Sequence, residues 1–192
     1  MNRKNWIWIL LIFVVGFSAF NLISAFRNKP QYQQLEFSAV YTFGLERPVE
    51  MDNKVRFAYE KTDQLQEAYE YFNTRTTEEK WKSYEDILTQ LSEKLPEPVK
   101  LLEYASTATM QGVELSIHER AVVEGLTAQQ GAVWVSGFGE NKLQLQENSR
   151  LVFVFPEEVA ILDVQPQPDR AEGNVLTWDT PGSLDFPVVR YQ

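Results

Sequence analysis

The segment LEFSAVYTFGLE (residues 35–46) alternates between larger apolar side chains and polar or smaller ones along its whole length. Successive side chains of a β-strand point to opposite faces of the sheet, so this period of two is typical of a half-buried strand. Residues 54–60 show the same alternation after a turn-forming stretch at residues 48–53. The two segments therefore predict an antiparallel pair of strands.

The period changes to that of a helix in residues 63–94. Apolar side chains recur there every three or four positions, which predicts two amphipathic helices over residues 63–73 and 77–94. Thr76 and Glu79 have the spacing of a capping box, in which each side chain bonds the backbone N–H of the other residue. We interpret the two helices as an insertion whose apolar stripe packs on the strands.

Strand patterns return after residue 99 and continue to the end of the chain. They predict a hairpin around GFGEN (137–141), a central buried strand in LVFVF (151–155), and further strands at 159–164, 175–178 and 186–191. The expected fold class is α+β, with a single N-terminal transmembrane helix followed by a β-sandwich-like domain with a two-helix insertion. The corresponding domains are an anchor at residues 1–29 and an extracytoplasmic β-rich domain at residues 30–192.

The predicted anchor is the run WIWILLIFVVGFSAFNLISAF (residues 6–26), which contains no charged residue. As a helix it would be roughly 30 Å long, the thickness of the hydrocarbon core of a bilayer. Trp6 and Trp8 at one end and Phe26 at the other are placed to contact the membrane interfaces. We therefore predict that residues 6–26 bind the lipid bilayer and that the C-terminal domain lies outside the cytoplasm.

Two alternatives to this anchor remain open, a cleaved signal peptide and a buried helix of a soluble protein. A signal peptide has an apolar region of only about 7–15 residues followed by a small-x-small cleavage site. Here the apolar run is longer, and the nearest such tract, Ile23-Ser24-Ala25, begins with a bulky residue. These features favour an uncleaved anchor in the cell membrane.

Composition excludes several classes of function. The chain of 192 residues has a formal net charge of −9 and lacks the basic surface that nucleic acid requires. Residues 31–192 hold 14 basic and 27 acidic residues, a net charge of −13. With no cysteine and with His118 as its one histidine, the chain has no ligands for a zinc ribbon or a two-histidine metal site. We predict no nucleic-acid partner, no cofactor and no metal.

Motifs of catalysis are also missing from the sequence. There is no phosphate-binding loop, nucleophile elbow, S-x-x-K sequence or calcium loop. His118 falls on the polar side of a strand pattern, where we interpret it as a surface histidine paired with a neighbour rather than as a catalytic base. Paired carboxylates hydrolyse glycosides or hold calcium, but turn formation and solubility account for Asp169, Asp179 and Asp185. We predict no catalytic residue and no enzyme activity.

Phe138 is the candidate partner contact, because it lies between two glycines in the predicted hairpin turn. An exposed aromatic side chain on a loop tip can anchor a partner or a sugar ring. The alternative is that these glycines simply form the turn.

The C-terminal stretch FPEEVAILDVQPQPD (155–169) followed by GNVLTWDTPG (173–182) resembles β-rich surface domains of uncharacterised membrane-anchored proteins of archaea and thermophilic bacteria. The resemblance covers about 40 residues and implies a single-pass anchor with an extracytoplasmic domain of unknown function. It implies no substrate, cofactor or catalytic residue. The predicted function is a membrane-anchored binding or scaffolding module. The alternatives are a subunit of a cell-envelope assembly that contacts another envelope protein through its transmembrane helix, and an enzyme whose site is not visible in the sequence.

Overall fold

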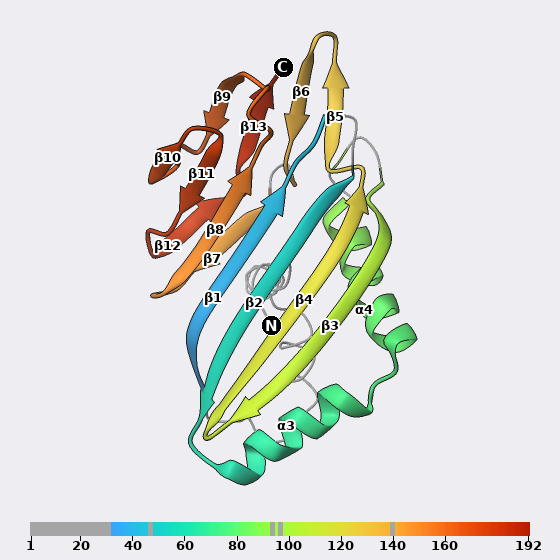
Figure 1. Ribbon diagram of the computed structural model, residues 1–192, viewed down its shortest axis with the longest axis vertical. Coiled ribbons are helices and arrows are strands. Elements are labelled where there is room, and N and C mark those ends of the chain that lie inside the picture. Colours follow the sequence, from blue (N-terminus) through green and yellow to red (C-terminus); the bar gives the residue numbers. More distant parts are fainter. Residues whose placement is uncertain (1–31, 46–47, 93–94, 96–97, 139–140) are drawn as a thin grey trace, which may run out of the picture.

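The computed structural model describes residues 32–45, 48–92, 95, 98–138 and 141–192. Its largest element is a strongly curved seven-stranded sheet (Figure 1). Neighbouring strands are antiparallel except for one parallel pair, formed by the first strand and the eighth. In spatial order the strands are β10 (Arg170–Glu172), β11 (Val175–Trp178), β8 (Ser149–Val154), β1 (Tyr32–Thr42), β2 (Val49–Tyr59), β4 (Glu114–Glu124) and β3 (Lys100–Gln111).

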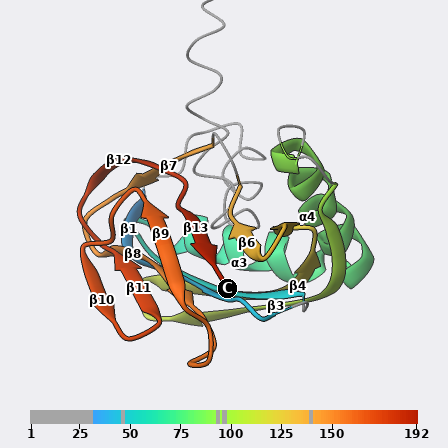
Figure 2. The same cartoon turned by 90° about the horizontal axis from the view of Figure 1, so that it is seen from above.

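Two helices and two smaller sheets lie on one side of this sheet (Figure 2). The helices are α3 (Thr62–Thr74) and α4 (Thr77–Ser92). The four-stranded sheet has the order β5 (Thr127–Gln130), β6 (Val133–Ser136), β13 (Val188–Tyr191) and β9 (Ile161–Gln165). The remaining pair is β12 (Gly182–Asp185) with β7 (Lys142–Leu145).

We call the covered side of the seven-stranded sheet the inner face and the opposite side the outer face. In β2 and β4, alternate residues point to the inner face and are buried there, as in Leu115, Ile117, Ala121 and Val123 of β4. The residues between them point to the outer face, where β2 carries Glu50, Asp52, Lys54 and Arg56. The period of two in the sequence therefore separates a packed face from a polar one.

Aromatic rings fill the core between the inner face and the smaller sheets. The ring of Phe153 lies at the centre, with centroids 5.2 Å from Trp178, 5.6 Å from Tyr41 and 5.8 Å from Phe186. All four side chains are at most 2% exposed. LVFVF thus lies in the central strand that its sequence predicts, with Leu151, Phe153 and Phe155 buried on one side.

The predicted fold class is wrong. The described chain is mostly β-sheet, and a second sheet does not cover the first as it would in a sandwich. The physical reason is strand length: β1 to β4 have 11 or 12 residues, roughly 36 Å, whereas the strands of the smaller sheets have four or five. The smaller sheets therefore cover only part of the inner face, while α3 lies at the other end of the long strands and α4 lies along the β3 edge (Figure 1).

The transmembrane part of that fold class is not supported by the structure. Among the described residues, neither helix combines the length and the apolar character that crossing a bilayer requires. The predicted anchor residues Trp6, Trp8 and Phe26 lie outside the described residues.

The two predicted helices are confirmed within two residues at each end. Their junction is the predicted capping box: the N–H of Glu79 donates to Thr76 Oγ1 at 3.2 Å, and the N–H of Thr76 donates to Glu79 Oε2 at 2.8 Å. These bonds satisfy two backbone donors that the start of a helix leaves without partners. The pKa of Glu79 is lowered, first by the backbone N–H of Thr76 and then by its hydroxyl.

Two local predictions are wrong. Residues 49–53 form the start of β2 rather than a turn, since Val49, Met51 and Asn53 point inward and are buried. The predicted hairpin around GFGEN is not formed either: β6 pairs with β5 and β13, and β7 pairs with β12. Short strands carry too little pattern to specify their partners, so sequence neighbours were mistaken for spatial neighbours.

Candidate functional site

The outer face carries two hollows, each formed by side chains from several strands. The first, which we call the central hollow, has a volume of about 630 Å³ and lies over β1, β2, β4 and the edge strand β3. Its charged lining residues are Glu50, Asp52, Glu103 and Arg120. Small apolar side chains such as Ala105 and Val122 also line it. A surface with few bulky groups between charged ones is suited to receiving part of a partner molecule.

Asp52 is the centre of a charge cluster at this hollow. Its Oδ2 atom lies 2.9 Å from His118 Nε2 and accepts a hydrogen bond from Arg120 Nε at 3.0 Å. Its Oδ1 atom lies 3.4 Å from Lys54 Nζ. The register of the strands produces this cluster, because Asp52 is paired directly with Arg120 and Lys54 with His118 across β2 and β4.

The pKa of Asp52 lies below its ordinary value. Partial burial is the largest single effect and would raise the pKa, but hydrogen bonds from His118 and Arg120, with the positive charges of His118 and Lys54, together outweigh it. The carboxylate is therefore held in its charged form, and the cluster gives the outer face a fixed pattern of charge.

His118 is thus a histidine paired with a neighbour, as its place in the strand pattern indicates. Its side chain is 30% exposed, and it bonds the carboxylate of Asp52, which Arg120 also contacts. A histidine that activates a nucleophile must reach a hydroxyl or thiol as well as its carboxylate. Among the described residues, His118 makes no such hydrogen bond, so the geometry favours an electrostatic role for the pair.

Two carboxylates at the central hollow are not neutralised. Glu50 and Glu103 make no ion pair or side-chain hydrogen bond with the rest of the described chain, whereas Asp52 contacts Arg120, Lys54 and His118. Three carboxylates and one guanidinium line the hollow, so its charge is negative. This charge favours a partner that presents a cationic or hydrogen-bond-donating group.

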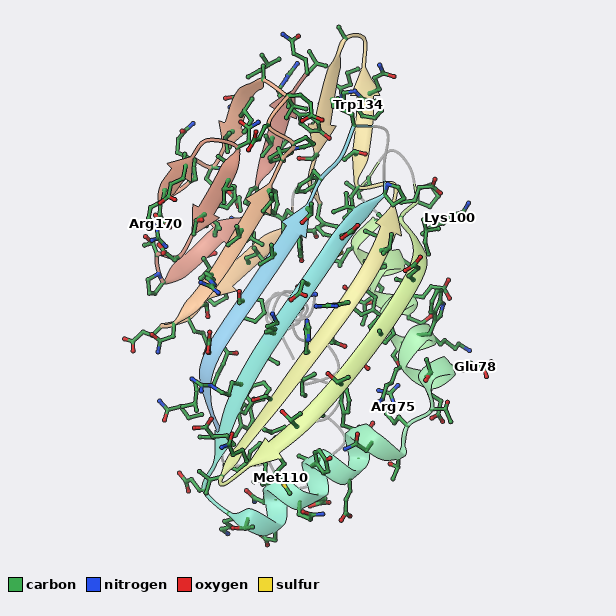
Figure 3. The ribbon with its side chains drawn as sticks, viewed as in Figure 1. Arg75, Glu78, Lys100, Met110, Trp134 and Arg170 are labelled. Carbon is green, nitrogen blue, oxygen red and sulfur yellow. The ribbon has the colours of Figure 1, made fainter. Side chains whose placement is uncertain are left out.

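The second hollow has a volume of about 620 Å³ and lies nearer the β10 edge of the sheet. We call it the arginine hollow, because Arg56, Arg150 and Arg170 line it together with Glu36 and Asp179. In Figure 3, Arg170 lies at this edge, whereas Lys100 and Met110 lie on β3 at the opposite edge. The two hollows give one sheet face an acidic region and a basic region.

A buried polar cluster lies on the inner face, under α4. The hydroxyl of Tyr104 donates to Glu119 Oε1 at 2.5 Å, and Asn53 Nδ2 donates to the hydroxyl of Tyr84 at 3.5 Å. Burial raises the pKa of Tyr84 well above its ordinary value. Each of these four side chains is at most 9% exposed. The cluster is closed to solvent, so we assign it to the core rather than to a site.

Phe138, the predicted partner contact, is not on an exposed loop tip. Its side chain has no exposed surface and packs edge-on against Phe186, with ring centroids 4.7 Å apart. The preceding Gly137 has φ +133°, and a Cβ atom there would lie 2.5 Å from the carbonyl oxygen of Pro187. Glycine is therefore needed for a close approach of two backbones that turns the next side chain inward. Gly137, which suggested an exposed turn, instead permits the burial of Phe138.

The C-terminal acidic residues serve turns and ion pairs. Asp169 accepts hydrogen bonds from the backbone N–H groups of Asp179 and Thr180, at 2.7 and 2.9 Å, and from the Thr180 hydroxyl. These bonds, led by that of the hydroxyl, lower its pKa. Asp179 pairs with Arg170, and Asp185 pairs with Lys142 at 2.8 Å. Within the described residues, no three acidic or histidine side chains are grouped closely enough to hold a metal ion.

Sequence reasoning missed Asp52, Arg120 and the three arginines of the second hollow. Asp52 fell in a stretch interpreted as a turn, and the arginines come from strands far apart in the chain. The available signal was the set of polar residues that alternate with apolar ones in each strand, because every second residue of a strand lies on the same face of the sheet. Pairing of the strands, which brings these residues together, is not contained in any single segment.

Fold and surface together define a β-rich domain with one packed and one charged sheet face. The chain belongs to the family described as a domain of unknown function, DUF4897, whose model matches residues 32–192. No curated protein gives a significant sequence match. Among solved structures, the NMR structure of the folded domain of LppM from Mycobacterium tuberculosis is similar, with a TM-score of 0.46 and 13% identity over 87% of this chain and 95% of that chain.

The family match confirms one part of the resemblance predicted from the C-terminal residues, namely a domain of unknown function. It extends over residues 32–192 rather than over the C-terminal 40 alone. The comparisons do not show the membrane anchoring that the resemblance implied.

Proposed function

We propose that this chain is a binding or scaffolding module that acts outside the cytoplasm, at the cell membrane, and that its outer face is the binding surface. The observation that carries the proposal is the contrast at the central hollow. Asp52 is held by contacts with Arg120, Lys54 and His118, and the adjacent Glu50 and Glu103 stay unpaired within the described chain. Charged side chains that make no ion pair within the fold are available to contact another molecule.

The place of action rests on the sequence before the domain. The run of residues 6–26 is hydrophobic and uncharged, which supports attachment to the lipid bilayer. The charge of −13 on residues 31–192 keeps the domain soluble and disfavours its lying flat on anionic lipid. Extraction of membranes with alkaline carbonate should leave the full chain in the pellet, and protease added to intact spheroplasts should digest residues 32–192. A chain that stays in the aqueous supernatant contradicts this placement.

The partner in this proposal is another protein of the cell envelope. A protein surface with exposed lysine or arginine side chains fits the acidic central hollow. An enzymatic role is not part of the proposal, because the Asp52–His118 pair bonds no nucleophile in the described chain. Nucleic acid is not proposed as a partner, since the described hollows combine basic with acidic groups and the chain is acidic as a whole.

Site-specific photo-crosslinking in cells tests the proposal. A photoreactive amino acid is placed at Thr107 or Val122, on the outer face near the hollow, or at Leu162 as a control. Leu162 is 49% exposed and lies on β9, outside the seven-stranded sheet. We expect discrete crosslinked species from the first two positions and not from Leu162. Equal crosslinking from all three positions contradicts the outer face as a specific surface.

A charge reversal gives a second, independent test. Glu103→Lys replaces one unpaired carboxylate of the acidic central hollow with a cation, whereas Glu67→Lys makes the same change at an exposed glutamate of α3. We expect Glu103→Lys to reduce the crosslinked yield from Thr107 by about tenfold, equivalent to roughly 1.4 kcal/mol. Glu67→Lys should leave the yield unchanged. The same loss in both variants would indicate a general effect of charge instead of a site.

A further inference from the structure

The arginine hollow brings together three guanidinium groups from three strands of an acidic chain. Arg56 comes from β2, Arg150 from β8 and Arg170 from β10. The order of the strands explains the grouping. β2 and β8 lie on either side of β1, and β10 lies two strands beyond β8, next to β11. The arginines thus stand on a hydrogen-bonded sheet, where side chains are positioned more firmly than on a loop.

The three arginines differ in what they already bind. Arg56 lies 3.4 Å from Glu36 and 3.5 Å from Glu114, and Arg170 forms an ion pair with Asp179. Arg150 has no carboxylate partner within the described residues. Its Nε donates a hydrogen bond to Ser38 Oγ at 2.9 Å, and Ser38 is only 4% exposed. One of its five N–H donors is therefore used to fix the guanidinium, and the Nη donors stay available.

The floor beside Arg150 is fixed by further hydrogen bonds. The hydroxyl of Ser149, which is 3% exposed, accepts bonds from the backbone N–H of Gln146 at 3.2 Å and from Gln34 Nε2 at 3.3 Å. Asn148 has φ 59°, a left-handed conformation that asparagine tolerates better than most residues. The chain that leads into β8 is thus held in one shape, and little ordering is needed when a ligand enters.

We propose that the arginine hollow binds a phosphate group, with Arg150 as the main contact and Arg56 and Arg170 at its sides. A guanidinium presents two parallel N–H donors that match two oxygens of a phosphate. Arginines approaching from three strands suit a tetrahedral group, whereas a planar carboxylate offers only one plane of acceptors. The volume of about 620 Å³ leaves room for the rest of a phosphate ester. Ser38 is a positioning residue, which aims Arg150 without contacting the ligand.

This inference goes beyond the proposed function, because it names a ligand chemistry and a site away from the central hollow. The phosphate group is common to a soluble phosphate ester and to a lipid headgroup, and the test has an arm for each. The probes are inorganic phosphate, glycerol 3-phosphate, and vesicles of phosphatidylglycerol compared with vesicles of phosphatidylcholine. Acetate at the same ionic strength controls for a general preference for anions.

The experiment is isothermal titration calorimetry of the full chain in a zwitterionic detergent for the soluble probes, with vesicle flotation for the lipid probes. We expect Arg150→Gln to weaken binding of the phosphate probes at least tenfold, about 1.4 kcal/mol. Ser38→Ala should weaken it severalfold, because the guanidinium loses its fixed orientation. Arg190→Gln is the matched control, since Arg190 is an exposed arginine on β13. Its affinity should equal that of the unmodified chain.

Each outcome decides between these alternatives. Binding of inorganic phosphate or glycerol 3-phosphate that depends on Arg150 supports a soluble ester as ligand. Binding only to phosphatidylglycerol vesicles, if it is again lost in Arg150→Gln, supports a lipid headgroup as the ligand. Equal affinity in Arg150→Gln and Arg190→Gln, or acetate binding as tight as phosphate, overturns the proposal. Melting temperatures without ligand separate a binding defect from misfolding, and we expect them to be unchanged because Arg150 is exposed.

Discussion

The two faces of the seven-stranded sheet come from the same strands and use opposite kinds of interaction. On the inner face, large apolar side chains such as Phe153, Trp178 and Tyr41 are almost completely buried and hold the smaller sheets and helices in place. On the outer face, Asp52, Lys54 and Arg120 interact through partly exposed ion pairs. Burial of apolar area stabilises a fold strongly, whereas exposed ion pairs contribute little. The inner face should therefore determine stability and the outer face should determine binding.

Polar groups also differ between the inner and the outer face. The buried carboxylate of Glu119 receives a bond from Tyr104, because an unpaired charge in the core would be very costly. Glu50 and Glu103 stay unpaired in the described chain on the outer face, where water solvates them at little cost. A substitution therefore has different consequences depending only on which side of one strand it lies.

The largest effect is expected from Trp178→Ala on the inner face. Trp178 is 1% exposed, and its indole N–H donates to the carbonyl oxygens of Pro166 and Gln167, both at 3.1 Å. Losing the buried ring and this donor should lower the free energy of unfolding by about 3–5 kcal/mol. Urea denaturation with fluorescence or circular dichroism measures this change.

Thr177→Ala is the control for that experiment, since Thr177 is the preceding residue of β11 and points to the outer face. Its cost should be no more than about 0.5 kcal/mol. If both substitutions cost the same, the division between a stabilising face and a binding face is incorrect at this strand.

An intermediate effect is expected from Tyr104→Phe, which removes one oxygen atom from the inner face. The ring and its packing 4.8 Å from Tyr84 are kept, but Glu119 loses a charge-assisted hydrogen bond in a buried place. The expected cost is about 1.5–3 kcal/mol in the same denaturation assay. Tyr84→Phe should cost less, because the bond that its hydroxyl accepts from Asn53 is long, at 3.5 Å. A larger loss for Tyr84→Phe would contradict this ranking.

Sequence patterns predicted the parts of the fold that local physics determines. The helices and their capping box depend on residues three or four positions apart, and the alternation in residues 35–46 correctly indicated β1. Trp178 was expected in the core and is buried. Each of these features can be seen within one short segment.

Features that depend on distant segments were predicted poorly. The burial of Phe138 depends on a contact between Gly137 and Pro187, 50 residues apart in the chain. The charge cluster depends on the register that pairs Asp52 with Arg120, and the arginine hollow on a parallel pair between β1 and β8. Pairing of this kind is set by the fold as a whole, so no periodicity of one strand could indicate it.

The smallest effect is expected from Asp52 on the outer face, and it should depend on pH. The pKa of Asp52 is lowered in the folded chain, so its contribution to stability is fully present above its ordinary value of 3.8 and is lost as the pH falls through the lower folded value. Asp52→Asn should therefore lower the free energy of unfolding at pH 7 by less than about 1 kcal/mol, since the group is partly exposed. It should also flatten the decline of stability below pH 4. Asp86→Asn, which changes an exposed carboxylate of α4 without an ion pair in the described chain, should alter neither. If acid destabilises Asp52→Asn and the unmodified chain to the same extent, the cluster is not fixed in the way its distances indicate.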